Sequence, residues 1–416
     1  MERDTTVVGR EDAQQRAEKK IATRVAENEK VRGPVTALAT PIFASSTYLL
    51  DSAAHGARLA SVEGPLDGES PWLYSRWGNP TTDVAARTIN KLENGHTSFV
   101  TSSGMAAIST ALFAHLQAGD HVVAPEPVYG GTHEVFKSVL PSYGIEVSWV
   151  DGTSVEAYRE AIKDNTKVIY AETPANPTMC LCDLQGLGDL SKQFGVISMV
   201  DSTFASPCVQ TPLDFGVNIV IHSATKYLGG HSDLVAGCIS VDNASSAAKV
   251  FQTLKLFGGC PSAYDAFLLI RGMKTLDVRM ARHNANAMAI AAHLQQHDQV
   301  LQVHYPGLEG HPQHELAKRQ MKHGFGGMIA FEVKGGVQAG VTVLEKLKLI
   351  NLAVSLGGVE SLIEHAASMT HCMVPRKQRL QSGITDGLLR LSVGLEDVRD
   401  LIADLDQALT FLDSGV

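Results

Sequence analysis

Lys226 closes the stretch IVIHSATK and stands three residues before the pair Gly229 and Gly230. The apolar run predicts a buried strand, so the lysine would lie just beyond the end of that strand. Burial disfavours the ammonium form and lowers the pKa of a lysine, which makes the amine a nucleophile that forms imines with carbonyl compounds. Because a lysine beside glycines is usually a surface residue, this interpretation needs support from other residues.

Polar residues also follow the other strands that the sequence predicts. They are Ser103 and Gly104 after SFVT, Tyr129 after HVVAPEP, Glu172 and Asn176 after VIYA, Asp201 and Thr203 after ISMV, and Ser223 and Thr225 after IVIH. In an open parallel sheet, ligands bind outside the carboxyl ends of the strands. We therefore expect these side chains to converge on one crevice.

Part of this set suits a phosphate group. Ser103, Gly104 and Met105 open a predicted helix, and the N–H groups and dipole at a helix N-terminus bind anions. The hydroxyls of Ser223 and Thr225 would complete a phosphate cup. A serine at a helix start is also a common N-cap, so this pattern alone does not decide between a cap and a phosphate site.

Asp201 would end its strand inside the crevice, where a carboxylate is costly unless a cation meets it. A protonated pyridine nitrogen is such a cation. Together with a nucleophilic lysine and a phosphate cup, it indicates pyridoxal phosphate (PLP) bound covalently to Lys226. The joint placement of these residues at successive strand ends favours this hypothesis over a separate structural role for each.

The elements that must position these residues form an α/β pattern. Between residues 96 and 242, the β-rich runs HTSFVT, HVVAP, EVSWVD, KVIYAE, VISMVD and NIVIHS alternate with helical stretches. This alternation predicts a mostly parallel central sheet with helices on both faces. A long helical segment and two further strand-like runs after residue 272 indicate a smaller α+β domain. We predict an N-terminal arm at 1–72, a large PLP-binding domain at 73–272 and a C-terminal domain at 273–416.

The composition excludes some classes of function. The chain has 416 residues, of which 44% are hydrophobic and 19% charged, as is ordinary for a globular protein. Its net charge of -9 disfavours nonspecific binding to nucleic acid, which needs a basic surface. The N-terminal segment lacks the apolar region of a secretory signal, and no later run approaches the length of a membrane-spanning helix. We therefore expect a cytoplasmic enzyme without nucleic-acid or membrane partners.

Three further residues lie outside the strand-end set. Arg390 lies between two leucines on a predicted strand. If that strand is half-buried, the guanidinium suits a ligand carboxylate; if it is an edge strand, the arginine is a surface residue. Tyr74 and Arg76, in PWLYSRWGNPTT, precede the sheet.

The histidines of HPQHELAKRQMKHG fit no standard ligand spacing, so we expect no metal.

Taken together, the motifs resemble those of a known family. SSGMAA, VYGGT, ETPANPT, VDSTF, HSATKYLGGHSD, SLGGVESL, SMTH and GITDGLLRLSVGLE are similar to segments of the PLP enzymes of cysteine and methionine metabolism, which include cystathionine γ-synthase, cystathionine γ-lyase and methionine γ-lyase. The resemblance implies the fold of type I PLP-dependent transferases. It also implies γ-elimination or γ-replacement on a sulfur-containing or O-acyl homoserine-type amino acid. A β-eliminating lyase is the nearest alternative, and a pseudo-enzyme that keeps the cofactor site is a more distant one.

The resemblance implies a role for each matching position. Lys226 carries the cofactor, Asp201 meets the pyridine nitrogen, and Tyr129 stacks on the ring and acts as acid or base at the leaving group. The other cofactor-binding positions are Ser103, Gly104, Met105, Asn176, Thr203, Ser223 and Thr225, together with Tyr74 and Arg76, which reach the phosphate of a neighbouring subunit. The substrate-binding positions are Arg390, Ser355 and Asn176. Shared sites imply an active dimer, and the family's usual assembly is a homotetramer of two such dimers.

Four positions depart from the pattern of the two lyases. Where cystathionine γ-lyases tend to have an acidic residue, an arginine and a glutamate, this chain has Leu73, Glu134 and Val354. Where methionine γ-lyases typically have cysteine, it has Gly131. A site without those charges should hold the distal zwitterion of cystathionine poorly. We expect a compact γ-substituent, while methionine γ-lyase, cystathionine γ-lyase and cystathionine γ-synthase activities all remain open.

Overall fold

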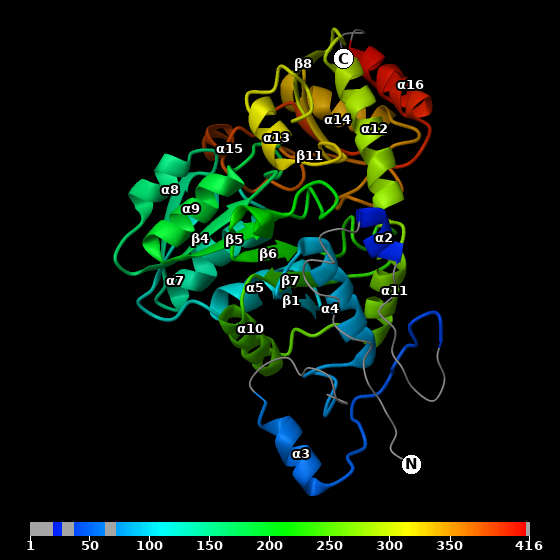
Figure 1. Cartoon of the computed structure of the whole chain (residues 1–416). Coiled ribbons are helices and arrows are strands. Elements are labelled where there is room, and N and C mark those ends of the chain that lie inside the picture. The colour runs from blue at the N-terminus through cyan, green and yellow to red at the C-terminus, as the bar shows by residue number, and fades with distance from the viewer. Residues whose placement is uncertain (1–19, 27–36, 63–71, 413–416) are drawn as a thin grey trace.

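The structure is a computed structural model that describes residues 20–26, 37–62 and 72–412. Figure 1 shows two sheets with their helices: the larger sheet fills the middle of the molecule, and the smaller one lies at the end that carries the C-terminus. Much of the predicted N-terminal arm, 1–72, lies outside the described residues. The division into these three predicted domains stays a prediction.

The larger sheet has seven strands in the order β1-β7-β6-β5-β4-β2-β3. The strands are β1 (Thr97–Thr101), β2 (His121–Glu126), β3 (Glu146–Asp151), β4 (Thr166–Glu172), β5 (Ile197–Asp201), β6 (Ile219–His222) and β7 (Gly237–Val241). All are parallel except β7, which is antiparallel to both of its neighbours. The mostly parallel sheet that the alternating pattern predicted is confirmed, whereas β7 was not among the predicted strands.

Helices cover both faces of this sheet. They are α4 (Pro80–Glu93), α5 (Gly104–Phe113), α6 (Gly130–Glu134), the π-helix η1 (Val135–Val139), α7 (Leu140–Ser142), α8 (Val155–Ala161), α9 (Leu184–Phe194), the 3-10 helix η2 (Pro212–Phe215), α10 (Ala244–Phe257) and α11 (Ala263–Met273). Val122 and Ala124 pack in a core with α5 and α10, whereas Val123 packs in a core with α8 and α9. Burial on both faces explains why these strands are apolar at nearly every position.

The smaller sheet has five strands in the order β10-β11-β12-β9-β8, and every pair but β10 with β11 is antiparallel. Its elements are α12 (Leu276–Leu294), β8 (Val300–His304), α13 (His314–Gln320), β9 (Met328–Val333), α14 (Gly336–Lys346), β10 (Asn351–Leu352), β11 (Leu362–His365), α15 (Arg376–Gln381), β12 (Leu388–Ser392), α16 (Val398–Leu409) and the 3-10 helix η3 (Thr410–Leu412). Helices α12, α14 and α16 pack together beside it (Figure 1).

Two glutamines connect the region around α13 to the loop after β4. The Gln313 side chain accepts a hydrogen bond from Leu181 N at 2.7 Å and donates one to Leu181 O at 2.6 Å. Gln320 donates to Cys182 O at 3.1 Å. Because both side-chain amides bond to backbone, they hold the C-terminal part of the chain beside the carboxyl edge of the larger sheet.

Two short helices precede the larger sheet, α2 (Ile21–Ala26) and α3 (Ala53–Ala60). The Ser52 side chain caps α3 by accepting a hydrogen bond from His55 N. Figure 1 shows α3 at the opposite end of the molecule from the smaller sheet. Within the described ranges, no helix is both long and apolar enough to cross a membrane.

Candidate active site

Lys226 lies four residues beyond the end of β6, in a loop that packs against the segment before β11. Its Nζ donates a hydrogen bond to Ser355 Oγ at 2.6 Å. Burial, with a smaller contribution from the Arg390 guanidinium, lowers the pKa of Lys226 to about 8. Gly357 has a φ of 76°, and a Cβ at this position would lie 2.6 Å from Tyr227 N, so a glycine is required where the two segments meet.

Arg279, on α12, forms hydrogen bonds to the loop that carries Lys226. Its guanidinium donates to Tyr227 O at 2.8 Å and to Gly272 O at 2.9 Å, and its Nε donates to Thr275 Oγ1 at 3.1 Å. Burial lowers the pKa of Arg279 to about 10. This arginine was missed by the sequence reasoning, because nothing in the helical pattern of α12 distinguishes it from a surface arginine.

Asp201 and Glu172 end neighbouring strands and lie opposite one another in the register of β4 and β5. Asp201 Oδ1 accepts a hydrogen bond from Thr203 N at 3.0 Å, and burial raises the pKa of Asp201. Glu172 accepts bonds from Tyr129 N at 3.0 Å and Asn176 N at 2.8 Å. Burial and the nearby Asp201 raise the pKa of Glu172 to about 8, while the two backbone donors oppose that change.

Glu172 was noted in the sequence only as a residue after a strand. In the structure it fixes the backbone at both Tyr129 and Asn176, which come from different loops. The Tyr129 side chain itself is 47% exposed. Glu172 is therefore a supporting residue that places two predicted site residues at the same edge of the sheet.

The N-terminus of α5 lies against the loop that follows β6. Ser103 caps the helix, since its Oγ accepts a bond from Ala106 N at 3.0 Å. A Cβ on Gly104 would lie 2.8 Å from Ser223 Cβ, so the absence of a side chain permits this approach. The first N–H groups of a helix have no partner within the helix, and in α5 these include the N–H groups of Gly104 and Met105.

Two threonine hydroxyls beside this helix end already have protein partners. Thr203 Oγ1 accepts a bond from Ser223 N at 2.8 Å. Thr225 Oγ1 accepts from Ala236 N at 3.0 Å and contacts Ala236 O at 3.1 Å. These bonds tie the ends of β5 and β6 and the segment before β7 into one rigid surface next to α5.

Arg390 lies on β12, which is the central strand of the smaller sheet and is buried along its whole length. The strand is therefore neither half-buried nor at the edge of its sheet, since β11 and β9 flank it on either side. Its guanidinium donates to Asn176 Oδ1 and to Ser355 O, each at 2.9 Å. It also lies 3.3 Å from Glu364 Oε1. The arginine therefore joins Asn176, Ser355 and Lys226 in one contact group.

Glu364 was not predicted as a site residue. It lies opposite Arg390 in the register of β11 and β12, and its side chain is 1% exposed. The run LIEH carries a signal, since a glutamate between apolar residues on a buried strand needs a cationic partner. Sequence alone did not reveal which cation that would be.

Tyr74 and Arg76 lie in the segment before α4. Tyr74 is 44% exposed and forms an isolated bridge with Thr47. The Arg76 guanidinium lies over the Tyr74 ring, 5.5 Å from its centroid, and bonds to Lys255 O at the end of α10. Within the described residues, no recorded contact joins this pair to Lys226 or Arg390.

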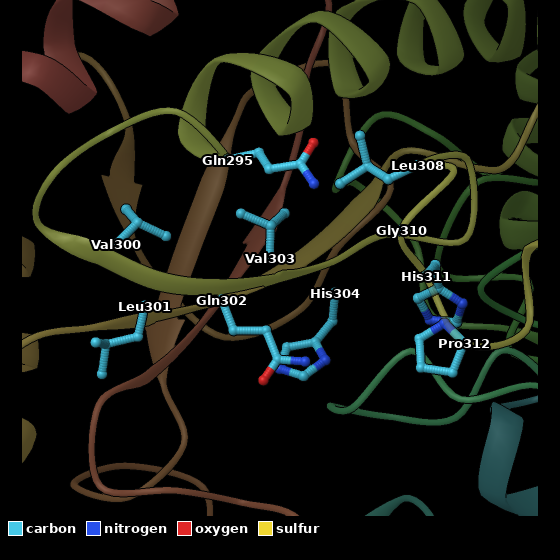
Figure 2. Close-up of a pocket in the computed structure, with 10 residues that line it drawn as sticks. All are labelled: Gln295, Val300, Leu301, Gln302, Val303, His304, Leu308, Gly310, His311 and Pro312. Carbon is cyan, nitrogen blue, oxygen red and sulfur yellow. The ribbon is translucent and has the colours of Figure 1, made fainter.

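A cavity of about 180 Å³ lies elsewhere, at β8 of the smaller sheet (Figure 2). Its lining includes Gln295, Gln302, His304 and His311, with apolar residues of β8 around them. None of the predicted site residues belongs to it. Among the described residues, no group of three metal-ligand side chains is close enough to hold a metal ion.

The similarities to known proteins cover nearly the whole chain. The family model described as Cys/Met metabolism PLP-dependent enzyme matches residues 22–410. L-methionine gamma-lyase of Fusobacterium nucleatum subsp. polymorphum is 47% identical over 374 residues, which cover 89% of this chain and 93% of the relative. Cystathionine beta-lyase of Coxiella burnetii is 44% identical, with 94% and 97% covered. The crystal structure of cystathionine gamma synthase from Xanthomonas oryzae pv. oryzae matches with a TM-score of 0.89 and 38% identity, over 96% of this chain and 100% of that chain.

Proposed function

Because the chain belongs to the Cys/Met metabolism PLP-dependent enzyme family, we propose that it catalyses γ-elimination or γ-replacement on a sulfur-containing or O-acyl homoserine-type amino acid. The observation that carries this proposal is the environment of Lys226. Its amine has a pKa lowered to about 8 and lies 2.6 Å from Ser355 Oγ, at the edge where Asp201 and Arg390 also lie.

The residues at this edge fit pyridoxal phosphate. The buried Asp201 carboxylate matches a protonated ring nitrogen, and the helix end at Gly104 matches a phosphate. Thr203, Ser223 and Thr225 form the surface beside that helix end. We assign Lys226 as the attachment point, with Ser103 acting on the phosphate only through its cap of α5.

The protein's residues then divide the work of the reaction. Bound PLP supplies an electron sink that acidifies the substrate's Cα–H bond. Lys226, neutral in part near pH 8, would take the proton from Cα. It would have to pass that proton on before it could take a second one from Cβ. Tyr129, whose backbone Glu172 fixes, would lie against the cofactor ring and would donate a proton to the departing γ-substituent. Arg390, with Asn176 and Ser355 around it, binds the substrate carboxylate.

The γ-substituent that fits best is compact. A Cβ at Gly131 would lie 2.7 Å from Tyr129 Cε1 and 3.0 Å from Met105 Sδ, so a larger residue there would displace the tyrosine ring. Val354 is 57% exposed and offers no charge to a distal amino-acid group. A thiomethyl or acyloxy substituent suits these surroundings better than the zwitterionic arm of cystathionine. The 44% identity to a cystathionine beta-lyase keeps β-elimination as a second candidate.

We propose a homotetramer of two active dimers, in the cytoplasm. Tyr74 and Arg76 would extend to the phosphate of the neighbouring subunit's cofactor. Their exposure and distance in sequence from the strand ends support this arrangement, as do exposed apolar residues near them, among them Leu49 and Phe257. A second subunit would bury such side chains.

The proposed function is tested by locating the cofactor. Borohydride reduction of the purified protein, followed by peptide mapping, should place the cofactor on Lys226. Lys226→Ala should lose the absorbance near the visible edge and all turnover, whereas the surface variant Lys318→Ala should keep both; Lys318 pairs only with Glu315 in the described structure. Cofactor found on another lysine, or turnover by Lys226→Ala at the wild-type rate, would refute the assignment.

A further inference from the structure

Glu364 and Arg390 form a buried ion pair in the smaller sheet. The two residues lie directly opposite one another on β11 and β12, so their side chains leave the same face of the sheet. Glu364 Oε1 lies 3.3 Å from Arg390 Nη1, and the side chains are 1% and 6% exposed. Because both residues belong to paired strands of one sheet, this ion pair does not depend on the conformation of a loop.

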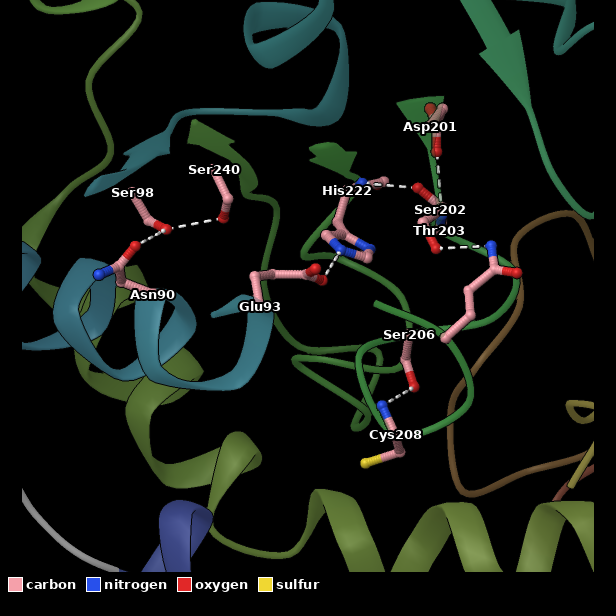
Figure 3. A network of polar contacts seen from close by, with 12 residues as sticks. Asn90, Glu93, Ser98, Asp201, Ser202, Thr203, Ser206, Cys208, His222 and Ser240 are labelled. Carbon is pink, nitrogen blue, oxygen red and sulfur yellow. Dashed lines mark hydrogen bonds and ion pairs between the residues drawn. The ribbon is translucent and has the colours of Figure 1, made fainter. Parts of the chain in front are cut away.

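The buried acids of the candidate site differ in their partners. Asp201 accepts a hydrogen bond from Thr203 N, as Figure 3 shows, and Glu172 accepts bonds from two backbone N–H groups. Within the described ranges, neither of these acids forms an ion pair with a lysine or an arginine, whereas Glu364 does. Glu364 is therefore the acid of this set that neutralises a cation of the protein itself.

The protein uses only part of the Arg390 guanidinium. A guanidinium has five N–H groups in a fixed plane. Its recorded hydrogen-bond acceptors are Asn176 Oδ1 and Ser355 O, each at 2.9 Å, and its Nε has no partner among the described residues. Arg390 therefore keeps donor capacity for a ligand carboxylate, and that carboxylate would be the second anion beside it.

Two anions that share one guanidinium repel one another. Burial raises the pKa of Glu364, and the Arg390 guanidinium opposes this effect by favouring the ionised carboxylate. Repulsion between Glu364 and a ligand carboxylate is screened less in a buried site than in water. Without a ligand, the same ion pair compensates Arg390 for its lost hydration. Both effects reduce the free energy gained when a carboxylate binds.

We propose that Glu364 determines how strongly the site binds carboxylates: as the resident counter-ion of Arg390, it limits the affinity for the α-carboxylate of the substrate and of a keto acid product. A keto acid formed by γ-elimination keeps that carboxylate, so it would have to leave the same arginine. The inference rests on the proposed function, because it takes Arg390 as the group that binds the substrate carboxylate.

Calorimetry with the holoenzyme and 2-oxobutanoate tests the proposal. Glu364→Gln keeps the size of the side chain but removes its charge, and we expect the variant to bind 2-oxobutanoate about tenfold more tightly than wild type. The uncharged 2-oxobutanamide should bind equally to both proteins. A selective gain in affinity is not the result that damage to the fold would give.

Glu332→Gln is the matched control. Glu332 lies on β9, the other neighbour of β12, where it is half-buried opposite Leu388. Within the described residues, no recorded contact joins it to Arg390. The substitution removes the same charge from the same sheet and should leave the affinity for 2-oxobutanoate at the wild-type value.

Arg390→Ala separates this proposal from the proposed function. If Arg390→Ala loses the preference for 2-oxobutanoate over the amide while Glu364→Gln shows no gain, the role of Glu364 is wrong and the assignment of Arg390 stands. If Arg390→Ala keeps the preference, Arg390 does not bind the carboxylate and both proposals fail. An equal gain in Glu332→Gln would show an effect of net charge and would also overturn the role of Glu364.

A crystal structure of the wild-type holoenzyme with 2-oxobutanoate is a test that needs no variant. We expect the ligand carboxylate on Arg390 with Glu364 still paired to the same guanidinium. A Glu364 side chain that turns away from Arg390 when the ligand binds would contradict the proposal, because the two anions would then not share the arginine.

Discussion

Replacing Lys226 with methionine should stabilise the cofactor-free protein at neutral pH. The folded state lowers the pKa of this lysine from its ordinary 10.5 to about 8, chiefly through burial. Below pH 8 both folded and unfolded chains carry the ammonium, so the full unfavourable contribution, about 3 kcal/mol, is present. As the pH rises from 8 to 10.5 the folded state loses its proton first, and the contribution disappears.

Methionine removes the charge but also the hydrogen bond to Ser355, which is worth about 1 kcal/mol. The free energy of unfolding of Lys226→Met should therefore exceed that of wild type by about 2 kcal/mol at pH 7. At pH 9 the lysine's cost has fallen to about 2 kcal/mol, and the advantage should shrink to about 1 kcal/mol.

Urea unfolding of both apoproteins at pH 7 and pH 9 measures this difference. Lys318→Met is the control, because Lys318 is exposed and its substitution should give the same small change at both pH values. A Lys226→Met protein that is less stable than wild type at pH 7, or a difference that does not vary with pH, would refute the reasoning. The lysine would then be accommodated as a cation in the folded state.

Three other predictions concern the substrate and the assembly. Arg390→Lys should lower kcat/KM by about 100-fold, because one ammonium cannot replace the two donors that a guanidinium presents to a carboxylate. Steady-state kinetics of the folded variant and of wild type measure this change. Mixing inactive Lys226→Ala and Arg76→Ala subunits should restore part of the activity if Arg76 acts across a subunit interface; proven subunit exchange without recovery would count against a shared site. In a competition among methionine, homocysteine, O-acetylhomoserine and cystathionine, we expect cystathionine to have the lowest kcat/KM. Each missing polar contact should raise its activation free energy by about 1 to 3 kcal/mol. Mass analysis of the products also separates γ-elimination from replacement and β-elimination, and a tenfold preference for cystathionine would contradict the specificity argument.

The larger sheet was predictable because its strands are buried on both faces. Such strands are apolar at nearly every position, and the turn residues between them mark where each one ends. The same reasoning missed β7, Gly237–Val241, whose run GCISV is short and begins with glycine. Because β7 is antiparallel and inserted between β1 and β6, a simple βαβ alternation does not contain it.

The residue patterns alone predicted the candidate site only where its residues follow strands, whereas Ser355 and the role of Arg390 came from the family resemblance. Asp201 and Glu172 end neighbouring parallel strands, so their proximity follows from topology. Arg390 and Glu364 come from a separate sheet, and their place depends on how the two sheets pack. Arg279 bonds to a loop carbonyl 52 residues away in the chain, a contact that no local pattern contains.

The charged side chains of the candidate site are unfavourable for the protein without a ligand. Burial lowers the pKa of Lys226 and raises the pKa of Asp201, so folding disfavours the charged form of each side chain. Ser355, which accepts bonds from both Lys226 and Arg390, has a φ of 85°, a conformation that non-glycine residues rarely adopt. Bound PLP would offset the costs at Lys226 and Asp201, because its carbonyl would take up the amine and its protonated ring nitrogen would pair with the carboxylate. The features that weaken the fold are therefore the ones that we propose bind the cofactor.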